Sequence, residues 1–214
     1  MKVKVITRIL EANDRIAAEN RKLFNKAGVY VINLMSAPGA GKTSLIEQTI
    51  TELHRKLRIG VIEGDIAGTG DAQRIEKLGI PVIQINTGSA CHLDANMINE
   101  AIVDLPLKDL DLLIVENVGN LVCPAEFKVG EDRKVMILSI TEGDDKPLKY
   151  PLMFQESSAL ILNKIDLLPY TNADLEKIKM DSLSLNPSLK IFEVSCKTGQ
   201  GIAEWTEWLQ SLVP

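Results

Sequence analysis

Residues 29–43 read VYVINLMSAPGAGKT and join an apolar run to a glycine-rich turn and the start of a helical pattern. In such a turn, small residues let backbone N–H groups converge on anionic oxygens at the N-terminus of a helix. Residues 36–43 match the phosphate-loop pattern G-x-x-x-x-G-K-[ST], except that Ser36 replaces the first glycine. The segment therefore predicts a strand, a phosphate-binding loop and a helix, in that order.

The lysine and threonine of this loop have separate expected roles. Lys42 is expected to reach the β- and γ-phosphates of a nucleotide, and the hydroxyl of Thr43 to bind Mg²⁺. A glycine-rich turn with an incidental lysine is the alternative, but the order of strand, glycines, Lys-Thr and helix disfavours it. The loop predicts a nucleoside triphosphate without identifying the base. The expected nucleotide contacts here are Gly39, Ala40, Gly41, Lys42, Thr43 and Ser44.

Short apolar runs alternate with helical segments along the rest of the chain. Such runs are typical of strands buried on both faces of a parallel sheet, and parallel strands need helical crossovers. We therefore predict an α/β P-loop NTPase fold, with a mostly parallel, doubly wound sheet flanked by helices. Residues 117–133 hold two glycines, a proline and mixed charges, and predict a long loop. The expected strands are 29–35, 58–63, 80–85, 111–116, 134–140, 159–163 and 190–194, and the expected helices lie near 42–57, 71–79, 93–104, 147–156, 171–184 and 201–212.

The N-terminal segment is also predicted to be a helix. Ile9, Ile16 and Leu23 recur every seven residues with polar residues between them, which places them on one apolar stripe. We expect this helix, within residues 1–28, to pack on a nucleotide-binding domain that spans residues 29–214.

The composition excludes several classes of protein. The 214 residues include 24 basic and 29 acidic side chains, for a net charge of −5, whereas nucleic-acid-binding surfaces need excess Lys and Arg. No apolar run approaches the ~20 residues of a membrane span, and the start MKVKVITRILEANDR lacks the apolar core of a secretory signal. Three cysteines in a chain without export features favour a cytoplasmic setting with reduced thiols. We expect neither nucleic acid nor membrane as a partner.

Residues 163–166, Asn-Lys-Ile-Asp, follow an apolar run and match the guanine-reading N-K-x-D motif of regulatory-type GTPases. The Asp166 carboxylate can accept the ring N1–H and the exocyclic amine of guanine, an arrangement that adenine lacks. Residues 195–197, Ser-Cys-Lys, resemble the S-A-K loop that touches the guanine carbonyl, with Cys196 at the small position. Two such loops in this order favour GTP and GDP over ATP, and over an ordinary charged turn. The expected base contacts are Asn163, Lys164, Asp166, Ser195, Cys196 and Lys197.

Carboxylates are predicted where two strands end near the phosphates. Asp65 follows the strand at 58–63, and the spacing from Glu116 to Gly119 resembles the D-x-x-G switch of GTPases, with Glu for Asp. The carboxylates and Thr43 are expected to hold Mg²⁺, and the Gly119 N–H to sense the γ-phosphate. Asp71 lies in the same glycine-rich turn as Asp65, and the alternative for both is that they are solvated acids of that turn. The expected catalytic residues are Lys42, Thr43, Asp65, Glu116 and Gly119.

A second set of residues predicts a softer metal. Cys91 and His92 are adjacent, and Cys123 lies on the irregular loop; two thiolates and an imidazole suit Zn²⁺ or Ni²⁺ rather than Mg²⁺. Three protein ligands would leave an open coordination position. The alternative is that both cysteines are small buried hydrophobic residues and His92 a polar residue at a helix start. Because Cys123 lies seven residues after Glu116, we hypothesise that nucleotide state sets metal affinity through residues 116–123.

Six segments, in order, resemble the HypB family of hydrogenase nickel-incorporation GTPases: SAPGAGKT, GDIAGTGD, TGSACHLDA, ENVGNLVCP, NKID and SCKTG. The match covers about residues 30–212, and its most specific parts are ACHLDA and ENVGNLVCP. The resemblance implies a GTPase that assists nickel insertion into nickel–iron hydrogenase precursors. It also implies that the metal ligands of the family carry over to Cys91, His92 and Cys123, and its nucleotide residues to the phosphate loop and the N-K-x-D motif.

The resemblance further implies partners. Members of the family dimerise when GTP binds, with the metal site near the interface, and work with the small metallochaperone HypA; the hydrogenase large-subunit precursor is reached indirectly. Such GTPases can lend a lysine across the interface, and Lys146 and Lys149 are both candidates. Some members carry an N-terminal cysteine-rich motif or a histidine-rich tract, whereas this chain starts MKVKVITRILEANDRIAAENR. Metal delivery is therefore expected to rest on the three ligands alone.

Two alternatives stay open at the level of sequence. One is a related accessory GTPase, such as the one that matures urease, although the Cys-Pro-His triplet of that family differs from the adjacent Cys91 and His92. The other is a metal-binding assembly module in which slow GTP hydrolysis acts as a timer. Measuring GTP turnover with and without a partner protein distinguishes the second alternative from a GTPase that drives nickel insertion. The three predicted ligands do not distinguish Ni²⁺ from Zn²⁺.

Overall fold

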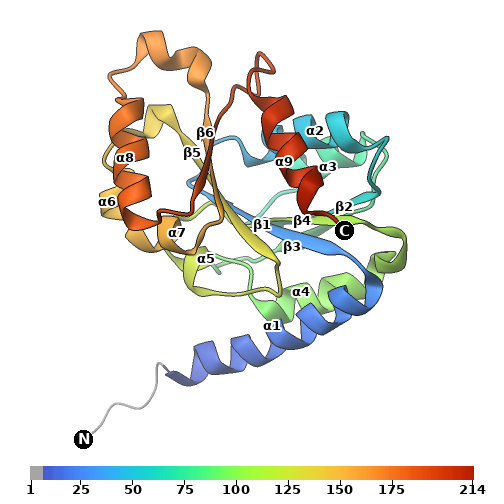
Figure 1. Ribbon diagram of the computed structural model, residues 1–214. Helices are drawn as coiled ribbons and strands as arrows, with labels where there is room; N and C mark the ends of the chain where they lie inside the picture. The colour runs from blue at the N-terminus through green and yellow to red at the C-terminus, as the bar shows by residue number, and fades with distance from the viewer. Residues whose placement is uncertain (1–6) are drawn as a thin grey trace, which may run out of the picture.

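Seven parallel strands form the central sheet of the computed structural model, which describes residues 7–214 (Figure 1). Their order in the sheet is β3-β2-β4-β1-β5-β6-β7. All of the predicted strands are confirmed, with ends that differ from the predicted ends by at most two residues. The strands are β1 Tyr30–Ser36, β2 Ile59–Asp65, β3 Val82–Asn86, β4 Leu112–Glu116, β5 Arg133–Ser139, β6 Ala159–Asn163 and β7 Lys190–Glu193.

The parallel arrangement brings the carboxyl ends of the strands to one edge of the sheet. β1 lies between β4 and β5, and its Leu34 is in register with Glu116 at the end of β4. The phosphate loop after β1, Asp65 at the end of β2 and Asn163 at the end of β6 therefore lie along the same edge. In open α/β sheets, ligands bind at this edge.

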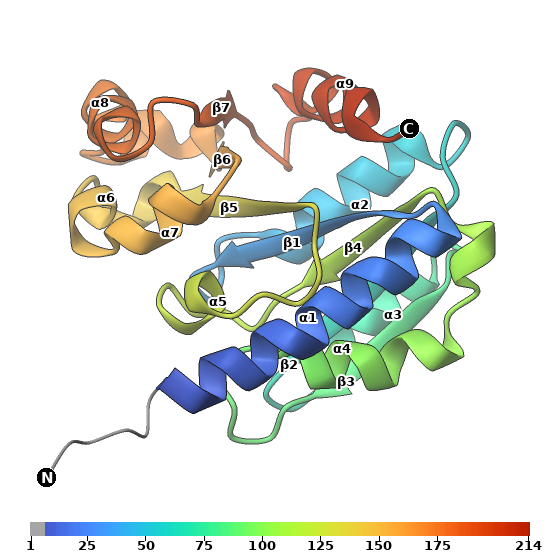
Figure 2. The same cartoon turned by 60° about the horizontal axis from the view of Figure 1, so that its bottom comes forward.

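Helices cover both faces of the sheet (Figures 1 and 2). One face carries α2 Lys42–Leu53, α3 Gly70–Glu76 and α9 Ile202–Leu212. The opposite face carries α1 Thr7–Ala27, α4 Ala95–Ala101, α5 Cys123–Glu126, α7 Pro151–Glu156 and α8 Leu175–Leu185, with α6 Lys146–Lys149 beside the last two. Short 3-10 helices lie at Ile102–Asp104, Leu107–Asp109, Ile140–Glu142 and Ile165–Tyr170.

The strands are buried on both faces, as their unbroken apolar runs predict. In β1, Ile32 and Leu34 pack under α2, while Val31 and Met35 point to the opposite layer of helices, and none of the four is more than 1% exposed. Burying each such side chain contributes roughly 1.5–3 kcal/mol to stability. The central strand that leads into the phosphate loop is therefore held firmly from both sides.

The N-terminal helix α1 lies beside α4 in the same layer of helices (Figure 2). The side chain of Asn20 is fully buried, and its Nδ2 donates hydrogen bonds to the carbonyls of Ala95, at 2.8 Å, and Val129, at 3.1 Å. Buried amide groups with two partners of this kind fix the angle at which a helix lies. Residues 1–6 of the predicted helix, and the side chain of Ile9, lie outside the described part of the chain.

Two predicted elements were wrong in detail. The helix predicted at 147–156 is divided into α6 and α7, because Tyr150 has φ −129° and ψ 55° and Pro151 cannot donate a backbone hydrogen bond. The loop predicted at 117–133 contains the single turn of α5, which Pro124 starts at a favourable position. The other predicted helices are confirmed, with ends within four residues of the predicted ends.

Candidate functional site

The phosphate loop connects β1 to the N-terminus of α2. Ser36, which stands where the motif has glycine, uses its hydroxyl to accept a hydrogen bond from Lys42 Nζ at 3.2 Å and to donate one to its neighbour's carbonyl at 2.7 Å. Gly41 has φ 103°, and a Cβ there would collide with the side-chain amide of Asn163. Only glycine fits this position. The loop is therefore already shaped to receive phosphates at the start of α2.

Thr43 and Glu116 are joined directly beneath this loop. The Thr43 hydroxyl donates a 3.0 Å hydrogen bond to Glu116 Oε1, and both side chains are buried. Burial raises the pKa of Glu116 to about 7, although the charge of Lys42 and the bond from Thr43 oppose the rise. The predicted pair of Mg²⁺ ligands from the phosphate loop and β4 thus lies together in the structure.

Glu63 is a candidate residue that the sequence prediction did not include. It lies in β2 opposite Glu116 of β4, and burial, reinforced by the negative charge of Glu116, raises its pKa to about 7. Carboxylate oxygens of Glu63, Asp71 and Glu116 lie within 4.8 Å of one another. An acid inside a mostly apolar, buried run was the sequence signal that could have revealed Glu63.

This cluster of carboxylates fits a hard divalent cation. Among the described residues, Oε2 of Glu63 and Oε2 of Glu116 are buried without a hydrogen-bond partner. Gathered carboxylates repel one another when ionised, and a cation that prefers oxygen ligands removes both the repulsion and the unpaired lone pairs. Asp71 therefore joins the candidate ligands on a geometric basis that the sequence alone did not provide.

Asp65 borders the same place without joining the cluster. Its Oδ1 accepts a 2.7 Å hydrogen bond from the backbone N–H of Ile66. It lines a cavity of about 220 Å³ that also contains Lys42, Glu63 and Gly119. Its assignment as a Mg²⁺ ligand stays a prediction.

The two base loops meet beside the phosphate loop. Asn163 donates from Nδ2 to the carbonyl of Ala40 at 2.9 Å, and Lys164, in the left-handed region at φ 64°, donates from Nζ to the carbonyl of Gly39 at 2.7 Å. Asn163 Oδ1 also accepts from the backbone N–H of Cys196, at 3.3 Å. These contacts tie both base loops to the phosphate loop, as guanine-nucleotide recognition requires.

The carboxylate of Asp166 faces a cavity of about 410 Å³. Ser195 Oγ donates to Asp166 Oδ1 at 2.6 Å, which orients the carboxylate. Cys196 lines the same cavity, and burial raises the pKa of its thiol to about 11, so the thiol is neutral. Lys197 also lines it. Five of the six residues predicted to contact a guanine base line this cavity, whereas Ser195 is buried behind it and contacts Asp166.

Cys91, His92 and Cys123, the metal triad, come together although Cys123 is distant in sequence. The sulfur of Cys91 lies 2.9 Å from that of Cys123 and 3.7 Å from Nδ1 of His92. The three ligand atoms lie within 4.8 Å of one another, and each residue is half-buried. One ion could therefore contact all three, which is the geometry that the predicted Zn²⁺ or Ni²⁺ site needs.

The surroundings of His92 and Cys123 favour the neutral forms of these two side chains. Burial lowers the pKa of His92, whose ring lies 3.9 Å from the ring of Phe127. Burial, and then the hydrogen bond with Cys91, raise the pKa of Cys123 to about 11. A neutral imidazole is ready to bind a metal, whereas a thiol must lose its proton as the metal enters.

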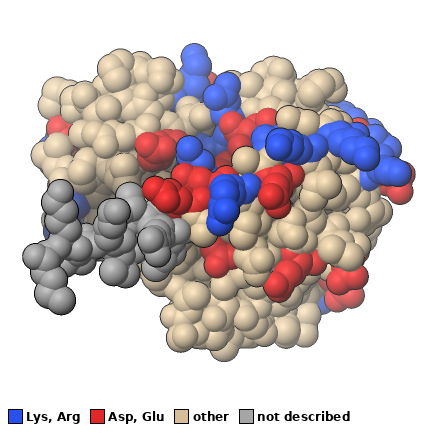
Figure 3. Space-filling model, turned by 90° about the horizontal axis from the view of Figure 1, so that it is seen from below, with Lys and Arg blue, Asp and Glu red and all other residues tan. Residues whose placement is uncertain are grey.

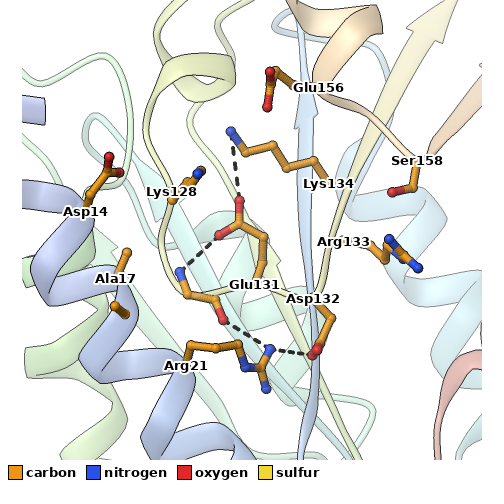
Figure 4. Close-up of a pocket in the computed structure, with 12 residues that line it drawn as sticks. Asp14, Ala17, Arg21, Lys128, Glu131, Asp132, Arg133, Lys134, Glu156 and Ser158 are labelled. Atoms are coloured by element: carbon orange, nitrogen blue, oxygen red, sulfur yellow. Dashed lines mark hydrogen bonds and ion pairs between the residues drawn. The ribbon is translucent and has the colours of Figure 1, made fainter. Parts of the chain in front are cut away.

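Another cavity lies at the opposite edge of the sheet from the phosphate loop (Figure 4). Its volume is about 460 Å³, and it lies at the amino ends of β5 and β6, away from the phosphate loop. Its charges are partly paired with one another, with Arg21 2.5 Å from Asp132 and Lys134 3.9 Å from Glu131. This cavity contains none of the predicted nucleotide contacts.

The surface charge agrees with the composition. On the face seen in Figure 3, Lys and Arg side chains are interspersed with those of Asp and Glu. Among residues 7–214, no helix combines the length and the hydrophobicity needed to cross a membrane.

The sequence matches one family of nucleotide-binding proteins over most of its length. The model of the CobW/HypB/UreG nucleotide-binding domain matches residues 30–193. Hydrogenase maturation factor HypB of Escherichia coli K12 is 49% identical over 203 residues, which are 95% of this chain and 70% of that protein.

Two solved structures are similar along nearly the whole chain. HypB from Archaeoglobus fulgidus superimposes with a TM-score of 0.90 and 40% identity, and the match covers 95% of this chain and all of that one. HypB from Helicobacter pylori, solved in complex with nickel, gives a TM-score of 0.89 and 40% identity over 94% of each chain.

Proposed function

The chain belongs to the HypB family of hydrogenase maturation factors, and from that premise we propose that it is a Mg²⁺-dependent GTPase that controls nickel delivery. The observation that carries the proposal is the position of the metal triad. Cys123 lies on residues 116–123, hereafter the switch loop, which also holds Glu116 and Gly119. One loop thus reaches both the nucleotide site and the metal site.

In this proposal the nucleotide is held by groups that are already oriented. Lys42 and the backbone N–H groups of the phosphate loop bind the phosphates, and Asp166 accepts two N–H groups from guanine. The candidates to hold Mg²⁺ are Thr43, Glu63, Asp71 and Glu116, together with the predicted ligand Asp65. When bound, the ion would neutralise charge on the β- and γ-phosphates. Hydrolysis in this proposal depends on positioning and charge stabilisation.

The metal is cargo in this proposal. Three ligands leave a fourth position open for a donor or acceptor protein, whereas closed structural zinc sites use four. Ni²⁺ and Zn²⁺ both accept the thiolate and imidazole ligands of the triad. We propose a HypA-type metallochaperone as the protein partner at this position, with the hydrogenase large-subunit precursor reached indirectly.

We further propose that GTP promotes a homodimer. Both lysines that could act across its interface pair with Asp145, Lys149 at 2.9 Å and Lys146 at 3.3 Å. The side chain of Lys149 is 60% exposed and that of Lys146 is 19% exposed. Lys149 is therefore the better candidate to reach a second subunit.

Titration of Ni²⁺ and Zn²⁺ into wild type and Cys91→Ala tests the metal assignment. We expect wild type to bind one ion per chain at the triad and Cys91→Ala to lose at least about tenfold in affinity, because a ligand is removed. Cys196→Ala is the matched control, since this third cysteine lies in the base cavity. Equal metal affinity in all three proteins, with an unchanged fold, would indicate that Cys91 and Cys123 pack in the structure and do not bind the metal.

A further inference from the structure

The switch loop contains two asparagines whose side chains bind backbone groups near the metal ligands. Asn117 follows Glu116 directly, and Asn120 follows Gly119. Asn117 is fully buried, and Asn120 is half-buried. Both therefore lie between the residues proposed to contact nucleotide and the residue Cys123.

Asn117 joins the loop to the segment that carries Cys91 and His92. Its Oδ1 accepts hydrogen bonds from the backbone N–H of Leu93, at 2.9 Å, and from that of Val118, also at 2.9 Å. Leu93 is the residue directly after His92. One buried oxygen thus links the backbone of the switch loop to the backbone of the metal-binding segment.

The other end of the same amide is tied to β1. Asn117 Nδ2 donates to Asn33 Oδ1 at 3.1 Å, and the backbone N–H of Asn117 donates to the carbonyl of Leu34 at 3.0 Å. These residues lie on the strand that leads into the phosphate loop. A buried amide with this many partners has one orientation, so its position follows that of the strand and the loop together.

Leu93 is held on its other side as well. Its side chain is fully buried, and a Cβ on Gly64 would lie 2.6 Å from Leu93 Cγ. Gly64 separates Glu63 from Asp65 in β2. Leu93 therefore rests on the strand end that bears the carboxylates, and its N–H points to Asn117.

Asn120 binds the backbone next to the third ligand, Cys123. Its Oδ1 accepts hydrogen bonds from the backbone N–H of Val122, at 2.7 Å, and from that of Cys123, at 3.3 Å. These bonds start the turn of α5 on which Cys123 sits. On the nucleotide side, a Cβ on Gly119 would lie 3.0 Å from the backbone of Pro38 in the phosphate loop.

We propose that Asn117 and Asn120 are positioning residues that transmit nucleotide state to the metal triad, Asn117 to Cys91 and His92, and Asn120 to Cys123. The inference rests on the proposed function, because it assigns residues to the coupling between nucleotide and metal. Movement of Gly119 against the phosphate loop displaces both amides. Metal–ligand bonds of about 2.0–2.3 Å tolerate little displacement, so small backbone shifts change how tightly the ion is held.

The test compares zinc affinity, measured by competition with a chromophoric chelator, in the presence of GDP and of a non-hydrolysable GTP analogue. The quantity compared is the zinc ratio, which is the larger of the two zinc dissociation constants divided by the smaller. Coupling between two sites typically changes affinity by 5–150-fold, so we expect a zinc ratio of at least about five in wild type. We expect the zinc ratio of Asn117→Ala to be below about two, and that of Asn120→Ala to lie between this value and the wild-type value. Both variants keep all three ligands, so one zinc should still bind per chain.

Asn186→Ala is the matched control. Asn186 Nδ2 donates to the carbonyls of Phe154 at 3.1 Å, Gln155 at 3.4 Å and Ser157 at 2.8 Å, and these contacts lie among α7, α8 and β6. Its loss should lower stability and leave the zinc ratio at the wild-type value. If Asn117→Ala does not fold, the half-buried Asn120→Ala carries the test.

Two negative results have different meanings. A wild-type ratio that both switch-loop variants retain would overturn the assignment of the asparagines and leave the proposed function standing. A ratio of one in wild type and in Asn186→Ala would overturn the proposed coupling itself, and this inference with it. Linkage supplies an independent check, since zinc must change the ratio of the affinities for the two nucleotides by the same factor.

Discussion

The base loops and the metal triad lie near the same edge of the sheet but are held in different ways. Among the described residues, side chains of the base loops bond to the rest of the nucleotide site: Asn163 to Ala40, Lys164 to Gly39 and Ser195 to Asp166. The ligand atoms of the triad instead face one another, and the segments that carry them are fixed through backbone bonds to Asn117 and Asn120.

This difference separates recognition from control. A base site that is fixed by its own hydrogen bonds can read guanine without rearranging, and so at little cost in conformational entropy. A metal site whose geometry depends on one loop can have two affinities, provided the loop has two positions. We infer that selectivity for nucleotide is built into the fold, whereas affinity for metal depends on the state of the switch loop.

The largest effect is expected from removing the phosphate-loop lysine. Lys42→Ala should lower GTP turnover by about 10²–10³-fold, because a positive charge aimed at the phosphates is lost. The number of metal ions bound per chain should not change. Phosphate release and a zinc titration measure the two effects, with Lys56→Ala, a change at an exposed lysine, as the control. Turnover within threefold of wild type would remove Lys42 from the mechanism.

A smaller effect is expected in the base site. Asp166→Asn replaces an acceptor of two N–H groups with an amide, and loss of charged hydrogen bonds should weaken GTP binding by about 100-fold. Xanthosine triphosphate should be bound better than GTP by the variant, because xanthine presents a carbonyl where guanine has an amine. Calorimetry with both nucleotides measures this preference. Asp174→Asn, at the N-cap of α8, is the control, and equal weakening for both nucleotides would contradict the assignment.

The smallest effect is expected in the stability of the carboxylate cluster. Burial raises the pKa of Glu63 and of Glu116 from 4.5 to about 7. A raised pKa means that the folded state binds the protons more tightly than the unfolded state, so stability is lost as pH rises through 7. Without Mg²⁺, the melting temperature should fall by roughly 5 °C between pH 5.5 and pH 8.

The variant Glu63→Gln sharpens this prediction. Removing one of the two titrating acids should reduce the fall in melting temperature, while Glu76→Gln, at an exposed position on α3, should leave it at the wild-type value. Added Mg²⁺ should flatten the wild-type profile if the cluster holds the cation. A melting temperature that does not fall with pH in metal-free wild type would contradict the raised pKa values of the two carboxyls.

The fold and the base site were accessible from sequence because their signals are local. Each buried strand appears as an unbroken apolar run, and the phosphate loop and N-K-x-D motif follow such runs directly. The division of the helix at Tyr150 was local as well, since Pro151 marks it. The sequence nevertheless predicted one helix at 147–156, because apolar residues recur at helical spacing on both sides of Pro151.

The remaining parts depend on contacts between distant segments. Glu63 belongs to the carboxylate cluster only because the register of β2 and β4 sets it opposite Glu116. Asn117 lies in a motif that the sequence identifies, but its bond to Leu93 depends on how two loops pack at the end of the sheet. A single sequence carries the chemistry of these side chains and not their partners.

The measurement that tests the account most directly is the zinc or nickel affinity of the wild-type protein with GDP and with a non-hydrolysable GTP analogue, at saturating Mg²⁺. If the switch loop links the two sites, the dissociation constant differs at least about fivefold between the two nucleotides, and it does so with one ion per chain in both. If the dissociation constant is the same in both states, nucleotide and metal act independently, and the account is wrong.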